Sequence, residues 1–281
     1  MIKSKICSEE QYKYWNKSAY YWLKYDKEIN KKFYNITKIL FSKIKFSNIK
    51  NVLDVGCGSG FTTKIVSDKI GTSGRVLGAD LSSPMLALLN KKYNHIKNIS
   101  TLQSDVQSYS FKEQSFDLVF SRFGLMFFEN PYVAFANINY SLKNKGELFF
   151  VCWTDYKYNE FFSIPVKVFT SVTGIKKKRF NKCPGPFAFN SKKYIYNVLL
   201  KCNFTKIRIY TVKTDMIAEN LKTDVDIFMK VGIAAKMIRE NNINSVTIQK
   251  LKKTLTKYLK EKIYEKSGTY KAKFFLVNAV K

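Results

Sequence analysis

Three glycines at alternate positions follow a short apolar run in NVLDVGCGSG, residues 51–60. Glycine tolerates positive φ and, because it has no Cβ, lets the backbone approach a ligand closely. Gly56, Gly58 and Gly60 follow the spacing G-x-G-x-G, which differs from the G-x-G-x-x-G of dinucleotide-binding loops. Asp54, just before this loop, would repel a pyrophosphate but favours a ligand that carries an ammonium group. The loop therefore predicts a polar ligand other than a dinucleotide.

Two further acids follow later apolar runs. Asp80 ends RVLGAD and lies 20 residues after Gly60, about the offset at which an acid accepts hydrogen bonds from ribose hydroxyls. Asp105 follows the next run, where it could accept from an adenine amino group. A single such Asp is often only a solvated loop residue. Three acids at the ends of three successive strands, the first joined to the glycines, indicate one binding site.

Alternating strands and helices are expected to position these residues. Apolar runs at 51–55, 75–81, 98–105, 115–123 and 147–153 are typical of buried strands, and helices are expected over 61–70, 82–94 and 130–142. Asn130 before Pro131 is a helix-start pattern. This alternation predicts an α/β fold with a parallel sheet covered on both faces, with ligands beyond the carboxyl ends of the strands.

The flanking segments are less regular. Apolar residues at steps of three and four predict a helical segment over 9–44, and residues 154–190 are aromatic and irregular. A helix at 191–204, a strand at 205–217, helices in two pieces over 221–262 and a strand at 271–281 are expected. No linker rich in Pro, Gly or Ser marks a boundary, so a single domain is expected over 1–281. Its expected parts are a helical cap (1–50), a cofactor-binding core (51–153) and a lid with edge strands (154–281).

Composition narrows the class of protein. Five scattered cysteines without a C-x-x-C pair argue against a disulfide framework or a zinc site and favour a reducing compartment, the cytoplasm. The first residues contain no apolar run typical of a signal peptide, and no window is long and apolar enough for a transmembrane segment.

The net charge of +28 is carried almost entirely by lysine. Only five of the 49 basic residues are Arg, and the lysines are spread along the chain. Recognition of nucleic acid favours Arg and clustered charge, so the pattern indicates a compositional bias, and nucleic acid is not the expected partner. Weak, salt-sensitive attraction to polyanions, including an acidic membrane surface, still follows.

Taken together, the motifs resemble a known family. DVGCGSG, LGADLSSPML, SDVQSYSF, SFDLVFSRFGLMFF and LKNKGELFFVCW occur in the order seen in small-molecule class I S-adenosylmethionine-dependent methyltransferases of the type 11-like kind. YWN at 14–16 and GPFAF at 185–189 are similar to one bacterial branch. The resemblance implies a Rossmann-like, doubly wound, seven-stranded, mostly parallel sheet with an antiparallel last strand and helical lid insertions.

The resemblance also implies a role for each motif in binding S-adenosyl-L-methionine. Asp54 and the glycine loop would contact the methionine portion, and Asp80 would hold the ribose. Further cofactor contacts are implied for Cys57 in the loop, Leu81 and Met85 beside the adenine, Asp105 and Val106 at its edge, and Ser121, Arg122 and Phe123 at the border with the acceptor. No metal and no covalent intermediate is needed, because the protein aligns a nucleophile in line with the methyl group.

The methyl acceptor is less well defined. His95, the only histidine, falls on a loop expected to lie away from the acceptor, and Asp155 and Glu160 fall in a polar segment, so no catalytic base is named. Expected wall residues are Trp15, Asn16 and Tyr20 on the N-terminal segment, Met126 and Phe127 after the fourth strand, Trp153 after the fifth, and Phe187 and Phe189. An aromatic cavity predicts a small acceptor that is apolar or aromatic, quinone-like or lipid-like.

Three alternatives stay open. An RNA or protein acceptor is suggested by the charge and by KKKR at 176–179, although no appended RNA-binding module or N/D-P-P-Y/F motif is present. A protein that binds S-adenosylmethionine without catalysis would keep the same motifs. A nicotinamide-dependent oxidoreductase is disfavoured by the glycine spacing and Asp54. The acceptor, the methylated atom and the oligomeric state are not predicted.

Overall fold

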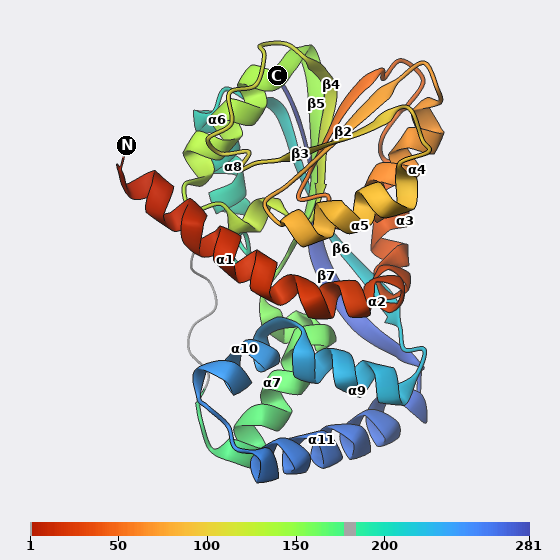
Figure 1. Cartoon of the computed structure of the whole chain (residues 1–281), viewed down its shortest axis with the longest axis vertical. Coiled ribbons are helices and arrows are strands. Elements are labelled where there is room, and N and C mark those ends of the chain that lie inside the picture. Colours follow the sequence, from red (N-terminus) through yellow and green to blue (C-terminus); the bar gives the residue numbers. More distant parts are fainter. Residues whose placement is uncertain (1, 177–183) are drawn as a thin grey trace.

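The computed structural model describes residues 2–176 and 184–281, in which seven strands form one sheet of order β3-β2-β1-β4-β5-β7-β6 (Figure 1). The first five strands pair in parallel, and β7 is antiparallel to both of its neighbours, β5 and β6. This arrangement confirms the doubly wound α/β sheet with an antiparallel last strand. The strands are β1 (Asn51–Val55), β2 (Arg75–Asp80), β3 (Ile99–Gln103), β4 (Phe116–Arg122), β5 (Leu142–Trp153), β6 (Thr205–Ile217) and β7 (Thr269–Val280).

Helices cover both faces of the sheet. Helices α3 (Tyr34–Ser42), α4 (Phe61–Ile70) and α5 (Ser83–Tyr93) lie on one face, and α6 (Pro131–Ser141) and α8 (Lys192–Lys201) lie on the other (Figure 1). The predicted start of α6 is confirmed, because the Asn130 side chain accepts a hydrogen bond from the Val133 N–H with Pro131 at the first helical position. Because β1 to β5 are parallel, their carboxyl ends all lie at one edge of the sheet, and α1 (Ile2–Lys24) crosses this edge.

The N-terminal cap is helical as expected, but it is broken twice. Helix α1 ends before Tyr25, α2 (Asp26–Lys32) ends before Phe33, and α3 follows. Tyr25 and Phe33 are both buried at these bends, with 9% and 5% exposure. Each bend lets an aromatic ring enter the core, so the cap can cross the carboxyl edge of the sheet and then pack along β5 and β6.

A helical layer lies beyond the carboxyl edge of the sheet. It consists of α7 (Glu160–Thr173), α9 (Leu221–Lys230), α10 (Gly232–Glu240) and α11 (Ser245–Leu259), which pack on one another (Figure 1). Residues 160–173 were expected to be irregular, but they form α7 despite Pro165, because buried Phe161, Ile164, Val168 and Phe169 recur at helical spacing.

Two further boundaries differ from the expectation. The helical segment over 221–262 is broken not only near 241–245 but also at Val231, because Gly232 adopts a positive φ of 82°. Strand β5 begins at Leu142, five residues before the expected start at Glu147, and residues 143–146 bulge out of the register with β4. Lys145 takes a φ of 65° in this bulge.

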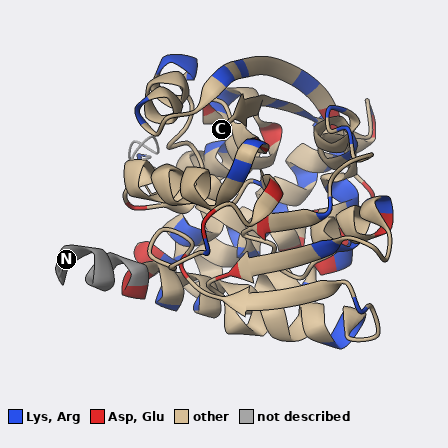
Figure 2. Cartoon of the chain, turned by 90° about the horizontal axis from the view of Figure 1, so that it is seen from above, with Lys and Arg blue, Asp and Glu red and all other residues tan. Residues whose placement is uncertain are grey.

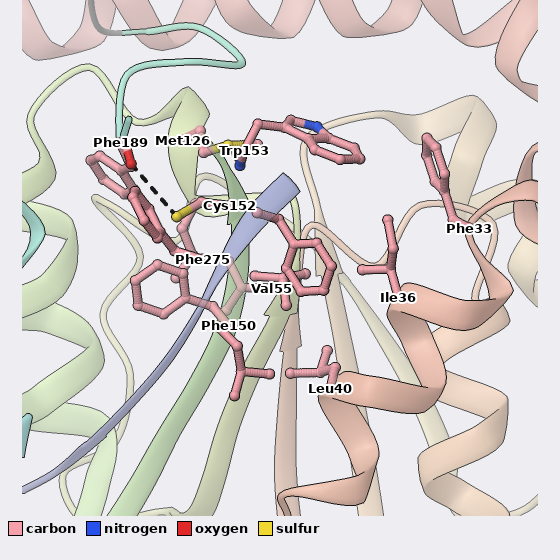
Figure 3. Packing of buried hydrophobic residues seen from close by; sticks show 14 of the residues in the cluster. Phe33, Ile36, Leu40, Val55, Met126, Phe150, Cys152, Trp153, Phe189 and Phe275 are labelled. Carbon is pink, nitrogen blue, oxygen red and sulfur yellow. Dashed lines mark hydrogen bonds between the residues drawn. The ribbon is translucent and has the colours of Figure 1, made fainter. Parts of the chain in front are cut away.

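The core is continuous from the cap to the last strand. One cluster of buried hydrophobic side chains includes residues of the cap, the sheet and the helical layer. Figure 3 shows Phe33, Ile36 and Leu40 of the cap facing Val55 and Trp153 of the sheet, with Phe150 and Cys152 beyond them. The carboxyl edge of the sheet is therefore held from both sides by packed aromatic and aliphatic side chains.

Within residues 2–176 and 184–281, no helix combines the length and the apolar character needed to cross a bilayer.

Candidate active site

The glycine loop, residues 56–60, turns between β1 and α4. Gly56, Gly58 and Gly60 all adopt positive φ, at 70°, 55° and 83°. A Cβ on Gly56 would lie 2.9 Å from the Cα of Gly124, so this glycine is needed for the close approach of two loops. A Cβ on Gly58 would meet no atom within 4 Å, so this part of the loop faces open space where a ligand can lie.

A cavity of about 320 Å³ lies at the carboxyl edge of the sheet. Its lining combines strand ends and loops with residues of α1, α2, α7 and α10. The residues expected at the cofactor that line it are Gly56, Cys57, Gly58, Asp80, Leu81, Met85, Asp105, Val106, Arg122 and Phe123, and those expected at the acceptor that line it are Trp15, Met126, Phe127 and Trp153. The position matches the rule that ligands of α/β sheets bind beyond the carboxyl ends of the strands.

Asp80 is fixed between the glycine loop and α5. One of its carboxylate oxygens accepts a hydrogen bond from the Gly58 N–H and the other from the Ser82 N–H, each at 2.8 Å. Burial raises the pKa of Asp80 above its ordinary value, although these amide donors oppose the shift. Asp105 is held in the next loop, where it accepts from the Gln107 N–H at 2.9 Å. Two acids that sequence assigned to the ribose and the adenine therefore line the same cavity.

Asp54 lies behind the glycine loop and is only 1% exposed. Its Oδ2 accepts hydrogen bonds from the hydroxyls of Thr62 and Thr63, each at 2.8 Å, whereas its Oδ1 is buried without a partner among the described residues. Burial raises the pKa of this carboxyl to about 7, against the two threonine hydrogen bonds and the positive charge of Arg122. Asp54 is not among the residues that line the cavity, so it acts from behind the glycine loop and does not make the ligand contact expected from the sequence.

Two other buried side-chain oxygens, Ser104 Oγ and Glu129 Oε2, also lack a hydrogen-bond partner among the described residues. Both residues line the cavity. Buried polar atoms in proteins are almost always paired, so unpaired ones that line a cavity are candidates for ligand contacts.

The cap contributes polar residues that the sequence analysis missed. Asp26 and Asn30 of α2 line the cavity, and Asn30 accepts a hydrogen bond from the guanidinium of Arg122 at 2.6 Å. Asp26 in turn accepts from the Ser59 hydroxyl of the glycine loop and pairs with Lys92 of α5. A signal was present, because Asp26 and Asn30 share one helical face with the apolar residues Trp22, Ile29 and Phe33.

An aromatic wall forms the other end of the cavity. The rings of Phe123 and Trp153 are stacked at 3.9 Å with an angle of 8° between their planes. The ring of Phe33 meets both edge-on, at 5.7 Å and 5.8 Å, and Figure 3 shows Phe33 and Trp153 side by side at the carboxyl edge. Phe161 and Phe162 of α7 complete the wall, and sequence missed them because their segment was expected to be irregular.

Some expected site residues do not line the cavity. Tyr20 is 65% exposed and does not line the cavity, because it lies on nearly the opposite face of α1 from Trp15 and Trp22. Asn16 ties α1 to α5, its Oδ1 accepting from the Ser83 N–H at 3.1 Å. Ser121 is fully buried and donates to the Val55 carbonyl oxygen at 2.7 Å. Gly60 packs against Leu89, where a Cβ would lie 2.5 Å from the leucine side chain.

Two expected aromatic residues and the three possible bases do not line the cavity. Phe187 and Phe189 are each 1% exposed and belong to the core. None of the considered bases lines the cavity, since His95 is exposed, Asp155 accepts from the Lys157 N–H, and Glu160 accepts from the Lys271 N–H. Of the KKKR segment, residues 177–179 lie outside the described residues, as does Cys183.

Comparison with known proteins agrees with this geometry. Residues 53–150, which run from β1 into β5, match a family model described as a methyltransferase domain. Residues 53–150 of the chain are therefore part of a methyltransferase domain. Methyl transfer with S-adenosyl-L-methionine as the cofactor was expected from the motifs, and this match confirms it.

Proteins similar to this chain in sequence or in structure are also named methyltransferases. The methyltransferase is 29% identical over 167 residues to the demethylmenaquinone methyltransferase of Staphylococcus haemolyticus, over 56% of this chain and 69% of that protein. A putative methyltransferase from Bacillus halodurans shares the fold with a TM-score of 0.55 at 18% identity, over 88% of this chain and 99% of that one. Phosphoethanolamine N-methyltransferase 2 of Haemonchus contortus, solved with S-adenosyl-L-methionine, has a TM-score of 0.52 at 18% identity, over 88% of this chain and 52% of that one, so this chain spans about half its length.

Proposed function

We propose that this methyltransferase transfers the methyl group of S-adenosylmethionine to a planar, apolar acceptor of the quinol kind. The observation that carries the proposal is the stacked pair of Phe123 and Trp153 with Phe33 edge-on, which continues directly from the cofactor side of the cavity. Aromatic side chains favour stacking and edge contacts with flat rings. The curated relative in Staphylococcus haemolyticus is named a demethylmenaquinone methyltransferase, which supports the same acceptor class at 29% identity.

The residues at the other end of the cavity fit the cofactor. Gly58 leaves room beside the loop for the methionine portion, and the negative charge of Asp54 behind the loop favours the ammonium group of that portion. We place the ribose hydroxyls on Asp80, whose carboxylate the Gly58 and Ser82 amides hold in position. The adenine would lie among Leu81, Met85, Asp105 and Val106, which line the cavity together.

The protein contributes positioning to the reaction. When bound, the cofactor supplies an electrophilic methyl group on its sulfonium. The aromatic wall orients the acceptor ring, and the cap and helical layer that line the cavity exclude water around it. His95, Asp155 and Glu160 do not line the cavity, so none of these three residues acts as a base on the acceptor there.

Methyl transfer to a reduced 2-polyprenyl-1,4-naphthoquinone tests the proposal. With a cofactor labelled in its methyl group, we expect label in the organic extract and a product heavier by one methyl group. Trp153→Leu removes the stack and should raise KM for the acceptor about 2- to 10-fold, with little change in cofactor affinity, since a stacked aromatic pair contributes about 0.5–1.5 kcal/mol beyond its burial.

Trp153→Phe keeps a ring at this position and serves as the matched control, expected to retain most of the activity. Asp80→Ala should abolish cofactor binding in calorimetry. Label that enters added RNA or protein, and none of the quinol, would replace this proposal with a macromolecular acceptor.

A further inference from the structure

We propose that Arg122 binds the carboxylate at the amino-acid end of the cofactor, and that Asn30 and Asp26 of the cap hold Arg122 in position for it. The inference rests on the proposed binding of S-adenosylmethionine in the cavity. It makes the N-terminal cap a part of the cofactor site, whereas the motifs of the core alone do not include it.

Arg122 has unused hydrogen-bond donors at the cavity. Its Nη1 donates to the Thr37 hydroxyl at 2.9 Å and its Nη2 to the Asn30 amide oxygen at 2.6 Å, so two of the five N–H donors of a guanidinium are occupied. Both of these acceptors are neutral. No Asp or Glu among residues 2–176 and 184–281 forms an ion pair with Arg122, although its side chain lines the cavity.

A guanidinium in this setting requires an anionic partner. Arg122 lies between the rings of Phe33 and Phe61, whose centroids are 5.9 Å and 5.4 Å from its central carbon. Burial lowers the pKa of Arg122 to about 10, so it stays protonated at neutral pH. Arginine presents a planar fork that matches a carboxylate with two parallel hydrogen bonds. A carboxylate in the cavity therefore completes the pairing that the described residues leave open.

The neighbouring charges select a zwitterion. Asp54, with its free Oδ1, and Arg122 interact electrostatically, and the positive charge of Arg122 lowers the pKa of Asp54 against the effect of burial. A carboxylate on Arg122 would meet the opposite charge at the cavity, and the negative charge of Asp54 behind the glycine loop favours an ammonium group beside that carboxylate. The amino-acid end of the cofactor carries this pair of groups on one carbon, and the acceptor ring carries neither.

The cap fixes the direction of the Arg122 side chain. The Asn30 amide nitrogen donates to both the carbonyl oxygen and the Oδ1 of Asp26, each at 2.9 Å, so its amide oxygen must face Arg122. Asp26 is itself held by the Ser59 hydroxyl and by Lys92. Asn30 and Asp26 are therefore positioning residues that connect the cap, the glycine loop and α5 to the guanidinium.

Calorimetry with two ligands that differ only in the carboxylate tests the inference. The ligands are S-adenosylmethionine and decarboxylated S-adenosylmethionine, and no acceptor is present. We expect the wild type to bind the first about 10- to 100-fold more tightly, because hydrogen bonds to charged groups contribute about 1.5–3 kcal/mol. Arg122→Gln should remove this preference while leaving the affinity for the decarboxylated ligand within about twofold.

Matched variants complete the test. Arg208→Gln, at an exposed position on β6, should leave both affinities unchanged. Arg122→Lys keeps the charge without the fork and should retain part of the preference, and it serves as the test if the glutamine variant does not fold. Asn30→Ala should reduce the preference by about two- to tenfold, since it removes one neutral hydrogen bond to Arg122.

Two results would overturn the inference. A wild type that binds both ligands equally shows that no group recognises the carboxylate. An Arg122→Gln variant that keeps the preference, or that loses affinity for both ligands alike, shows that Arg122 is not the carboxylate partner. If the wild type binds neither ligand, the proposed cofactor site itself fails, and this outcome is distinct from both.

Discussion

Asp54 illustrates at the residue scale how a site can be prepared for its ligand at a cost in stability. The carboxyl is buried, has two hydroxyl donors on one oxygen and none on the other, and its pKa is raised to about 7 from an ordinary value of 3.8. A raised pKa means that folding favours the protonated form, so the associated stability is present below about pH 3.8 and is lost as the pH rises through about 7. A cationic ligand would reverse this preference.

Asp54→Asn is therefore expected to separate stability from binding. The ligand-free variant and the wild type should be about equally stable at pH 5, and at pH 8 the variant should be more stable by about 2–3 kcal/mol. Its affinity for the cofactor should fall. In the wild type the affinity should rise between about pH 6 and pH 8, and in the variant this dependence should be absent. Thermal denaturation and calorimetry across this range measure both effects, and a variant less stable at pH 8 would contradict the assignment.

Phe123 shows a second kind of constraint on a single residue. Its φ of 66° lies in the left-handed region, which is unfavourable for a bulky side chain. The stack on Trp153 and a hydrogen bond from its backbone N–H to the Val151 carbonyl oxygen, at 3.2 Å, hold it there. Backbone strain of this kind is concentrated at functional sites, and here it turns the ring into the cavity between the cofactor and acceptor ends.

At the scale of elements, a buried ion pair connects the cap to the helical layer. Lys32 at the end of α2 pairs with Asp224 of α9 at 2.8 Å, and both side chains are 2% exposed. The Lys32 ammonium also donates to the Ile217 carbonyl oxygen, and Asp224 accepts from the hydroxyls of Tyr264 and Tyr270. Burial lowers the pKa of Lys32, against the attraction of Asp224. The pair thus fixes α2, which lines the cavity, to α9 of the helical layer.

Removing one partner of this pair should be strongly destabilising. Asp224→Asn leaves the Lys32 charge buried and uncompensated, which costs about 3–5 kcal/mol. Asp226, two residues along the same helix, pairs with Lys252 at 3.1 Å with both side chains partly exposed, so Asp226→Asn should cost at most about 1 kcal/mol. Urea unfolding of both variants measures the difference. Equal effects would show that burial of the pair does not determine its contribution.

At the scale of the whole molecule, the charge is distributed and not focused. Lys and Arg residues are scattered over many helices and loops (Figure 2). The edge strand β6 also carries the exposed basic residues Lys206, Arg208 and Lys213. Charged side chains on an edge strand commonly protect it from pairing with another chain. This pattern agrees with a compositional bias and does not define a binding surface for a polyanion.

Binding to anionic vesicles should accordingly be weak and sensitive to salt. In co-sedimentation we expect partial binding to vesicles rich in phosphatidylserine at about 50 mM salt and none at about 300 mM, because counterions screen distributed charge. Neutral phosphatidylcholine vesicles are the control and should not bind at either salt concentration. Binding that survives the higher salt would show that a specific lipid site exists.

Sequence alone identified the parts of the site that are encoded locally. The glycine loop and the acids Asp80 and Asp105 follow their strands directly, so a strand–turn–helix pattern was enough to place them at one edge of the sheet. The class of fold followed from the same alternation. The prediction that residues 154–190 are irregular was wrong for 160–173, which form α7, because Pro165 obscured the helical spacing of the aromatic residues.

The tertiary structure decided which distant residues meet. Arg122 contacts Thr37 and Asn30, which precede it by 85 and 92 residues, and Phe161 reaches the ring of Phe33 across the cavity. Trp15 lines the cavity and Tyr20 does not, because packing turns the face of α1 with Trp15 and Trp22 inward and Tyr20 lies on nearly the opposite face. Local patterns encode strands, turns and their ends, whereas contacts between distant segments depend on how helices bend and pack. The sequence by itself therefore placed the glycine loop, Asp80 and Asp105 at the cavity, whereas the aromatic wall and the cap's place in the lining depend on folding.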